Sequence, residues 1–177
     1  MRFGYEFYGN DVLTLAPSLL GQYLVCVSPE NNVTRYIITE TEAYRGEEDL
    51  ACHASKGRTQ RTEIMYNRGG NLYIYLIYGM YWMMNVVAGN KNEPQAALIR
   101  GIEGFDGPGK LTRALGIDKS FNGEDLVKSD RIWITESGMN PDYITTPRIG
   151  IGYAGEWKDK PWRYLMKSIT VATLHAT

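Results

Sequence analysis

The chain has 177 residues, of which 44% are hydrophobic and 22% are charged, the usage of an ordinary globular protein. This size fits one domain spanning residues 1–177, and the lack of internal repeats and low-complexity tracts excludes solenoid and disordered architectures. The formal net charge of −1 argues mildly against a nucleic-acid partner. However, acidic side chains concentrate in residues 1–50 and leave the remainder net positive, so a basic face is compatible with this charge.

Two further features bear on localisation and cofactors. The longest apolar run is too short and too interrupted to cross a bilayer, and residues 1–6 lack the apolar core of a signal peptide. We therefore expect a cytoplasmic protein with no membrane association. Cys26 and Cys52 are too few and too unpatterned for a disulfide framework or a zinc site, and we expect neither a metal nor a cofactor.

The first predicted elements are a short helix and two strands. The helix is predicted over Thr14–Gly21, with a threonine cap, Pro17 in its first turn and a glycine stop. The strands are predicted over Gln22–Val27 and Val33–Tyr44, joined by a polar turn. The second of these strands carries the residues with chemical potential.

Strict two-residue alternation would place two carboxylates and two phenols on one face of that strand. The residues on this face are Tyr36, Ile38, Glu40, Glu42 and Tyr44. The two glutamates would lie about 7 Å apart, near enough for one charge to raise the pKa of the other where water is excluded. A glutamate so placed can act as a general base, but an ordinary solvated strand face explains the same pattern.

A long loop rich in glycine and charge is predicted over Arg45–Gly70, and a loop of this length in a compact domain usually has a function. It contains His53 and four basic side chains that can hold phosphates, namely Lys56, Arg58, Arg61 and Arg68. A single loop histidine is more often structural than catalytic, so both interpretations of His53 remain open. The other histidine, His175, falls in a tail that we expect to fray.

The segment Leu72–Asn85 is dense in aromatic side chains and is predicted to form two strands that meet at Tyr78-Gly79. A phenol ring can stack on a nucleobase or wedge between base pairs, and Tyr78 at the tip is the natural wedge. The alternative is an ordinary buried hairpin, since aromatic residues commonly fill strands.

The later elements are a strand over Ala96–Gly101, a helix opened by Gly107-Pro108-Gly109 and a strand at Trp133. The helix start and Lys110 could receive a phosphate, or the helix could be an ordinary surface element. Residues Arg148–Trp157 contain a formal G-x-G-x-x-G, but no βαβ unit surrounds it and we reject dinucleotide binding. Short strands and helices without βαβ alternation predict an α+β domain.

These pieces share a chemical theme. An acid can activate water, tyrosines and a histidine can enclose a flat ring, and a basic loop can hold phosphates. Together they indicate hydrolysis at a base flipped out of a nucleic acid.

In its motifs the sequence resembles the alkyladenine, or 3-methyladenine, DNA glycosylase family of vertebrates and some bacteria. The resemblance runs in order from Phe7 to about Leu165. Its motifs are Glu40–Tyr44, Glu48-Asp49, His53, Gly57–Thr59, Tyr73–Tyr81, Asn85, Leu98–Arg100, Gly107-Pro108, Lys110-Leu111, Ala114-Leu115, Lys119–Phe121, Arg148–Trp157 and Pro161. Tyr153 stands where some relatives carry histidine.

The resemblance implies a single mixed domain with a curved, mainly antiparallel sheet, flanking helices and a protruding β-hairpin. It also implies base-excision repair of duplex DNA, by a monomer that binds the minor groove and hydrolyses the N-glycosidic bond of damaged purines. The implied substrates are 3-methyladenine, 7-methylguanine, hypoxanthine and ethenoadenine. No lysine is placed to form a Schiff base, so we expect a monofunctional enzyme. Without the long amino-terminal extension of vertebrate relatives, we expect a bacterial-type protein associated with the nucleoid.

The roles implied by the resemblance fall on particular residues. Glu42 would deprotonate the attacking water, and Arg100 would help to position that water. The base pocket would consist of Tyr44, His53, Tyr75 and Asn85. Tyr78 would intercalate, and the DNA backbone would be held by Arg58, Thr59 and Lys110.

Two rival functions remain at this level. A non-catalytic nucleic-acid-binding module would use the tyrosine hairpin and the basic loop, with Glu42 as a mere surface residue. A hydrolase of free nucleosides or glycosides would use Glu40 and Glu42 and would be indifferent to Tyr78.

Overall fold

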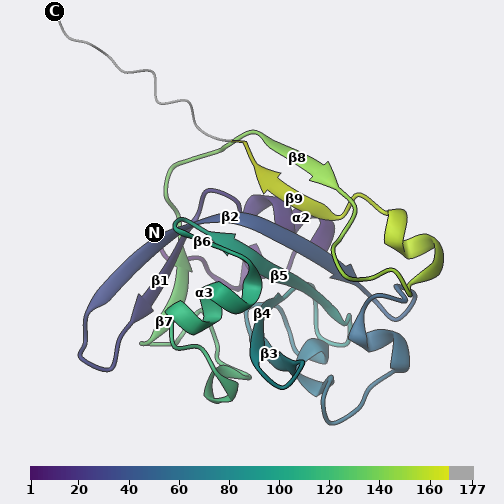
Figure 1. Cartoon of the computed structure of the whole chain (residues 1–177). Coiled ribbons are helices and arrows are strands. Elements are labelled where there is room, and N and C mark those ends of the chain that lie inside the picture. Colours follow the sequence, from purple (N-terminus) through teal and green to yellow (C-terminus); the bar gives the residue numbers. More distant parts are fainter. Residues whose placement is uncertain (168–177) are drawn as a thin grey trace, which may run out of the picture.

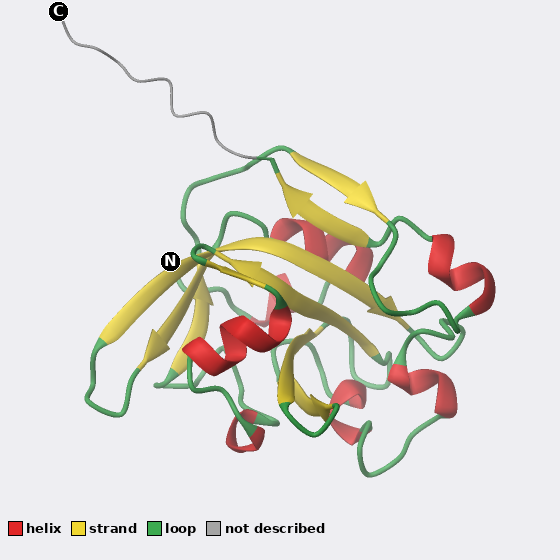
Figure 2. Cartoon of the chain, viewed as in Figure 1, coloured by secondary structure: helices red, strands yellow, loops and turns green. Residues whose placement is uncertain are grey.

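The computed structural model describes residues 1–167 and shows a curled antiparallel sheet with short helices around it (Figure 1; Figure 2). The predicted α+β class with a curved, mainly antiparallel sheet is confirmed. His175 lies outside the described residues. Within residues 1–167, no helix is long and apolar enough to span a bilayer.

The sheet of the described region has nine strands. They are β1 (Tyr23–Val27), β2 (Val33–Arg45), β3 (Leu72–Ile77), β4 (Tyr81–Val87), β5 (Gln95–Ile102), β6 (Phe105–Asp106), β7 (Ile132–Thr135), β8 (Tyr143–Thr146) and β9 (Arg163–Met166). The main order is β3-β4-β5-β2-β1-β7, with β6 beside β5, β9 beside β2 and β8 beside β9. The long strand β2 therefore lies at the centre and links the two ends of the sheet (Figure 1).

The helices are α1 (Tyr5–Tyr8), α2 (Val12–Ser18) and α3 (Pro108–Ala114), with 3₁₀ turns η1 (His53–Lys56), η2 (Glu63–Tyr66), η3 (Lys119–Phe121) and η4 (Gly155–Asp159). Helix α2 packs on β2 and β5, and α3 packs on β4, β5 and β6. The apolar faces of both helices enter one large core with the sheet.

The boundaries predicted for the first helix are wrong at both ends. Helix α2 begins two residues before Thr14, because the Asp11 carboxylate accepts a hydrogen bond from the Leu13 amide and caps the helix there. It ends at Ser18, so Pro17 lies in its last turn and not in its first. The short α1 and the pair β8–β9 have no counterpart among the predicted elements, since segments of four residues carry little periodic signal.

The other predicted elements are confirmed within a residue or two. Strand β2, the hairpin β3–β4, strand β5, helix α3 and the strand at Trp133 all form where the pattern places them. Around Gly150 the chain makes turns and no strand, which agrees with the rejection of dinucleotide binding.

A bulge at Thr39 breaks the predicted alternation of β2. In the ladder with β5, Ile38 pairs with Ile102 and Glu40 with Gly101, which leaves Thr39 unpaired. Ile38 consequently points into the main core together with Ala43, although an odd separation of five residues would put them on opposite faces of a regular strand. The prediction that Tyr36 and Ile38 share a face with the two glutamates is therefore wrong, because an extra residue reverses the phase.

Candidate active site

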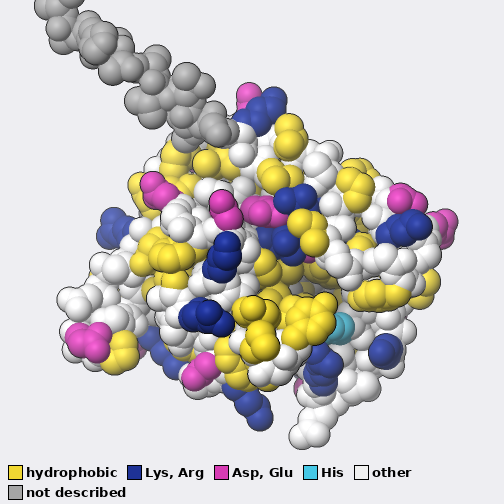
Figure 3. Space-filling view, in the orientation of Figure 1, with side chains coloured by type: hydrophobic (Ala, Val, Ile, Leu, Met, Phe, Trp, Pro, Cys, Tyr) yellow, Lys and Arg dark blue, Asp and Glu magenta, His cyan; other side chains and the backbone are white. Residues whose placement is uncertain are grey.

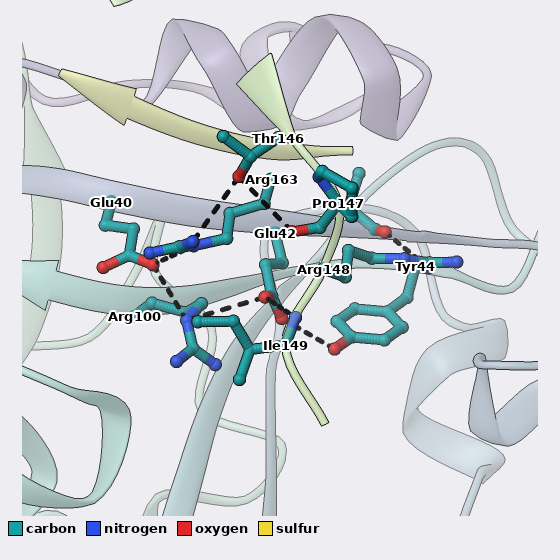
Figure 4. Close-up of polar contacts among 10 residues, drawn as sticks. Glu40, Glu42, Tyr44, Arg100, Thr146, Pro147, Arg148, Ile149 and Arg163 are labelled. Carbon is teal, nitrogen blue, oxygen red and sulfur yellow. Dashed lines mark hydrogen bonds and ion pairs between the residues drawn. The ribbon is translucent and has the colours of Figure 1, made fainter. Parts of the chain in front are cut away.

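Glu42 lies at the centre of the site and its side chain is fully buried. Its Oε1 accepts a hydrogen bond of 2.8 Å from the Ile149 amide, and its Oε2 accepts one of 2.8 Å from the Tyr44 hydroxyl (Figure 4). Burial raises the pKa of Glu42, while Arg100, the Ile149 amide and the Tyr44 hydroxyl favour the charged form and oppose that increase. The prediction of a solvated strand face is excluded for this glutamate.

Arg100 reaches Glu42 because it is the unpaired residue of the second bulge. Glu40 pairs with Gly101 and Thr41 with Ile99, so the ladder skips Arg100. Its Nε lies 2.9 Å from Glu40 Oε1 and 3.6 Å from Glu42 Oε1. The two glutamates and Arg100 thus form one cluster.

A second arginine in this cluster is absent from the sequence prediction. Arg163 comes from β9, where it stands opposite Glu42, and its Nε lies 2.5 Å from Glu40 Oε1. Glu40 is therefore held by two arginines at once (Figure 4). No signal near residue 163 could have revealed this contact, since it depends on the pairing of β9 with β2.

Next to Glu42 is a small pocket with aromatic walls. It is lined by Tyr44, Ala51, His53, Met65, Tyr73, Tyr75, Asn85 and Ala96. All four predicted pocket residues are present in this lining. Tyr44 belongs to both the pocket and the Glu42 cluster, so it connects the carboxylate to the space where a flat ring would lie.

The aromatic rings of the pocket contact one another in edge-on and tilted arrangements. The ring centroids of His53 and Tyr75 are 4.5 Å apart, and those of Tyr73 and Tyr75 are 5.3 Å apart. The guanidinium of Arg61 lies 5.4 Å from the centroid of Tyr75. Tyr73 was not among the predicted pocket residues, but its side chain also lines the pocket.

His53 is fixed by Tyr73, whose hydroxyl lies 2.9 Å from Nδ1 of the imidazole. Burial, followed by the nearby charges of Arg61 and Lys56, lowers the pKa of His53 to about 4. The imidazole is consequently neutral at physiological pH and does not supply a positive charge to the pocket.

Asn85 closes another wall of the pocket from β4. Its Nδ2 donates to the Tyr73 carbonyl at 3.1 Å, and the side chain is only 3% exposed. A buried amide tied to the neighbouring strand has little freedom to move aside. The pocket therefore has a fixed polar wall at this position.

Tyr78 lies at the tip of the β3–β4 hairpin, and its side chain is 86% exposed. Its φ of 50° and the φ of 68° at Gly79 are both in the left-handed region, which is uncommon for a bulky residue. Figure 3 shows hydrophobic side chains gathered over this hairpin with Lys and Arg side chains on either side. The described structure thus presents a tyrosine outward at a cost in backbone strain.

The predicted backbone-binding residues lie on exposed segments. Arg58 makes a surface ion pair of 2.6 Å with Glu63, and Thr59 hydrogen-bonds to Thr62 in the same loop. Lys110 is exposed in the first turn of α3. Tyr153 is 71% exposed and lines a second cavity beside His53.

Arg148 is a further buried residue that the sequence interpretation missed. Its guanidinium forms a bidentate pair with Asp49, at 2.5 and 2.9 Å, and both side chains are fully buried. It also lies over the Tyr44 ring, 4.8 Å from the centroid, and donates to the Ala43 carbonyl. Because Ile149 follows Arg148 directly in the chain, Arg148 fixes the position of the backbone amide from which Glu42 accepts a hydrogen bond.

The cysteines and acidic residues give no indication of a metal. Cys26 and Cys52 are free and buried, and burial raises the pKa of each thiol to about 12. In the part of the chain that is described, no cluster of three or more His, Cys, Asp or Glu side chains could hold a metal ion.

Comparison with known proteins identifies the family. The model of the methylpurine-DNA glycosylase (MPG) family matches residues 6–106 and 103–169. A protein of Legionella pneumophila is 43% identical, with 91% of this chain and 92% of the relative covered. One from Natranaerobius thermophilus is 39% identical, with 94% and 96% covered, and one from Rickettsia rickettsii is 41% identical, with 93% and 90% covered.

All three relatives are provisionally named 3-methyladenine DNA glycosylases. The family match spans almost the whole chain, and it includes the strands that carry Glu42, Tyr75 and Arg100. The chain therefore belongs to the methylpurine-DNA glycosylase family of DNA-repair hydrolases.

Proposed function

We propose that the protein flips alkylated or deaminated purines out of duplex DNA and hydrolyses their N-glycosidic bond with a water that Glu42 activates. The proposed substrates are 3-methyladenine, 7-methylguanine, hypoxanthine and ethenoadenine. The observation that carries the proposal is a fully buried carboxylate joined through Tyr44 to an aromatic pocket.

The surroundings of Glu42 suit a general base for this reaction. Breaking the N-glycosidic bond builds positive charge on the sugar, and a carboxylate beside it stabilises that charge while it takes a proton from water. Burial raises the pKa of Glu42 and makes the carboxylate more basic, while Arg100 favours its ionised form. Glu40 is a poorer base, because one of its oxygens already accepts from both Arg100 and Arg163.

The pocket suits an electron-poor purine. Tyr44 and Tyr75 would stack on the base with a cation–π contribution when alkylation has made the ring positive, and neutral His53 would not repel it. The mainly aromatic and apolar lining, with Asn85 and His53 as its polar groups, is in keeping with a flat base. Asn85 would hinder an exocyclic amino group, a discrimination of about 1–3 kcal/mol.

The exposed hairpin suits the flipping step. Tyr78 would fill the gap that the flipped nucleotide leaves, entering from the minor groove. Arg58, Thr59 and Lys110 would hold the backbone, and Arg58 can exchange its exposed partner Glu63 for a phosphate at little cost. One monomer contains all of these groups.

The decisive experiment uses a set of duplexes, each with a single lesion, and measures free base released together with heat-labile abasic sites. We expect release from at least one alkylated or deaminated purine, and neither activity on free nucleosides nor strand cleavage. We also expect Glu42→Gln to lose this release and Glu103→Gln to keep it, because the second variant removes the same charge from an exposed residue of the β5–β6 turn. If no duplex yields free base while nucleosides are hydrolysed, the chain is a small-substrate hydrolase and the proposal fails.

A further inference from the structure

The second glutamate of the cluster has an unusual set of partners. A single oxygen, Glu40 Oε1, accepts from Nε of Arg100 at 2.9 Å and from Nε of Arg163 at 2.5 Å. The side chains of Glu40, Arg100 and Arg163 are between 13% and 20% exposed. Two arginines and two glutamates, Glu42 among them, thus balance their charges in a region largely shielded from solvent.

The geometry of Arg100 shows what this sharing does. Its Nε makes the contacts with both glutamates, and its Nη groups point away from them (Figure 4). Within residues 1–167 neither Nη group has a hydrogen-bond acceptor. An arginine facing a lone carboxylate prefers a bidentate fork with two parallel N–H···O bonds. Arg100 instead makes a single contact with Glu40, at the oxygen that also accepts from Arg163.

The charges lead to the same conclusion. Without Arg163, Glu40 would neutralise the charge of Arg100, and a smaller positive charge would act on Glu42. The other groups that face Glu42 carry no net charge, so the charge balance at Glu42 depends on Arg100, Arg163 and Glu40. They are the hydroxyls of Tyr44 and Tyr75, the Ile149 amide and, behind Tyr44, the Asp49–Arg148 pair, which is itself neutral.

We infer that Glu40 and Arg163 are positioning residues that act through Arg100. Arg163 neutralises the charge of Glu40. Glu40 in turn holds Arg100 by its Nε, so that the positive charge of Arg100 acts on Glu42 and the Nη groups of Arg100 are free for the substrate. This inference rests on the proposed glycosylase function and assigns to Glu40 a role that excludes it as the base. It also makes strand β9, far along the chain from Glu42, part of the catalytic arrangement.

The test compares Glu40→Gln, Arg163→Gln and the double variant with the wild-type chain. Single-turnover excision is measured from pH 5 to 9 on the duplex that the wild type cleaves best, because this isolates the chemical step from product release. Glu42 must be ionised to act, so the rate falls as pH falls through its pKa, which defines the acid limb of the profile.

The two single variants should move this limb in opposite directions. Arg163→Gln removes a positive charge, disfavours the Glu42 carboxylate and moves the limb to higher pH. Glu40→Gln removes a negative charge and moves it to lower pH, and the double variant, with no net change in charge, should lie between them. The plateau rate should fall about 10- to 100-fold in each single variant, because Arg100 is misplaced.

Two further variants separate positioning from folding. Arg163→Lys keeps the charge and should keep the limb close to its wild-type position. Arg35→Gln changes the net charge equally at an exposed residue of β2 and should alter neither limb nor plateau. The inference is overturned if the acid limb moves in the same direction in both single variants, or if it moves in neither. Either result would leave the glycosylase function intact.

A second readout does not depend on activity. The Glu42 carboxyl group can be titrated by ¹³C NMR in the free protein, and its pKa should rise in Arg163→Gln and fall in Glu40→Gln. If the wild type releases no base from any duplex, the proposed function fails, and this titration alone decides whether Glu40 and Arg163 control the charge at Glu42. Equal pKa values in the wild type and both variants would refute such control.

Discussion

The buried cluster at Glu42 and the exposed tip at Tyr78 represent two opposite ways of preparing a group for function. Glu42 is 0% exposed and both of its oxygens accept hydrogen bonds, whereas Tyr78 is 86% exposed and sits at a positive φ. The first is held by Tyr44 of its own strand, by Arg100 of β5 and by the Ile149 amide of a loop distant in sequence. The second is held only by the turn of its own hairpin.

The difference follows from where each group finds its partner. A base that takes a proton from water must be desolvated and oriented before the substrate arrives, because preorganisation is what makes it effective. A wedge finds its contacts only in the DNA, so exposure and local strain in the free protein are expected of it. Mutations in the buried region should therefore affect chemistry and stability, and mutations at the tip should affect binding alone.

The largest effect is expected at Glu42 itself. Glu42→Gln keeps the size of the side chain and one accepting oxygen but removes the base, so excision should fall by about 10²- to 10⁴-fold. Binding to duplex DNA with an abasic-site mimic should persist. Single-turnover rates and binding isotherms measure the two quantities, and near-normal excision would remove Glu42 from its assigned role.

The next largest effect concerns the stability of the buried region. Arg148→Met leaves the Asp49 carboxylate buried without its partner, and the free energy of unfolding should fall by about 3–5 kcal/mol. The matched change in an exposed pair, Arg58→Met opposite Glu63, should cost far less, because solvent screens an ion pair on the surface. Urea titrations at neutral pH measure both values, and similar losses would erase the contrast between the buried and exposed regions.

His53 should make the stability of the protein depend on pH. Its pKa is lowered to about 4 in the folded state, so the stability it contributes is present above the unfolded pKa of about 6.5 and is lost as pH falls. Between pH 6.5 and 4.5 this loss is about 2 kcal/mol for the wild type. The variant His53→Gln should lose less over the same interval in urea titrations, and an unchanged loss would show that His53 is not responsible.

The smallest effect is expected at the tip of the hairpin. Tyr78→Ala should weaken binding to lesion-containing duplex by about 1–3 kcal/mol and change the free energy of unfolding by less than about 0.5 kcal/mol. Tyr143→Ala, at a partly exposed tyrosine of β8, is the control and should leave DNA binding unchanged. Normal duplex binding by Tyr78→Ala would end the intercalation hypothesis.

The sequence predicted the parts of the site that lie on regular local patterns. Glu42, Tyr44 and Tyr75 lie on strands with strong β signals, and Tyr78 lies at a turn marked by glycine. The face assignment within β2 was wrong because a bulge leaves no trace in an apolar–polar pattern. Arg163 and Arg148 escaped prediction because each acts on a residue of β2 or the following loop more than 95 positions away.

The sequence by itself determined the fold class, the family and the types of side chain available for chemistry, since these follow from local periodicity and from motifs in order along the chain. Only the tertiary structure decided that Glu42 is buried and Glu40 is shared by two arginines, and that Tyr44 joins the carboxylate to the pocket. The physical reason is that desolvation and charge balance depend on which distant strands pair. The register of β2 with β5 and β9, including the bulges at Thr39 and Arg100, brings Glu40, Arg100 and Arg163 together.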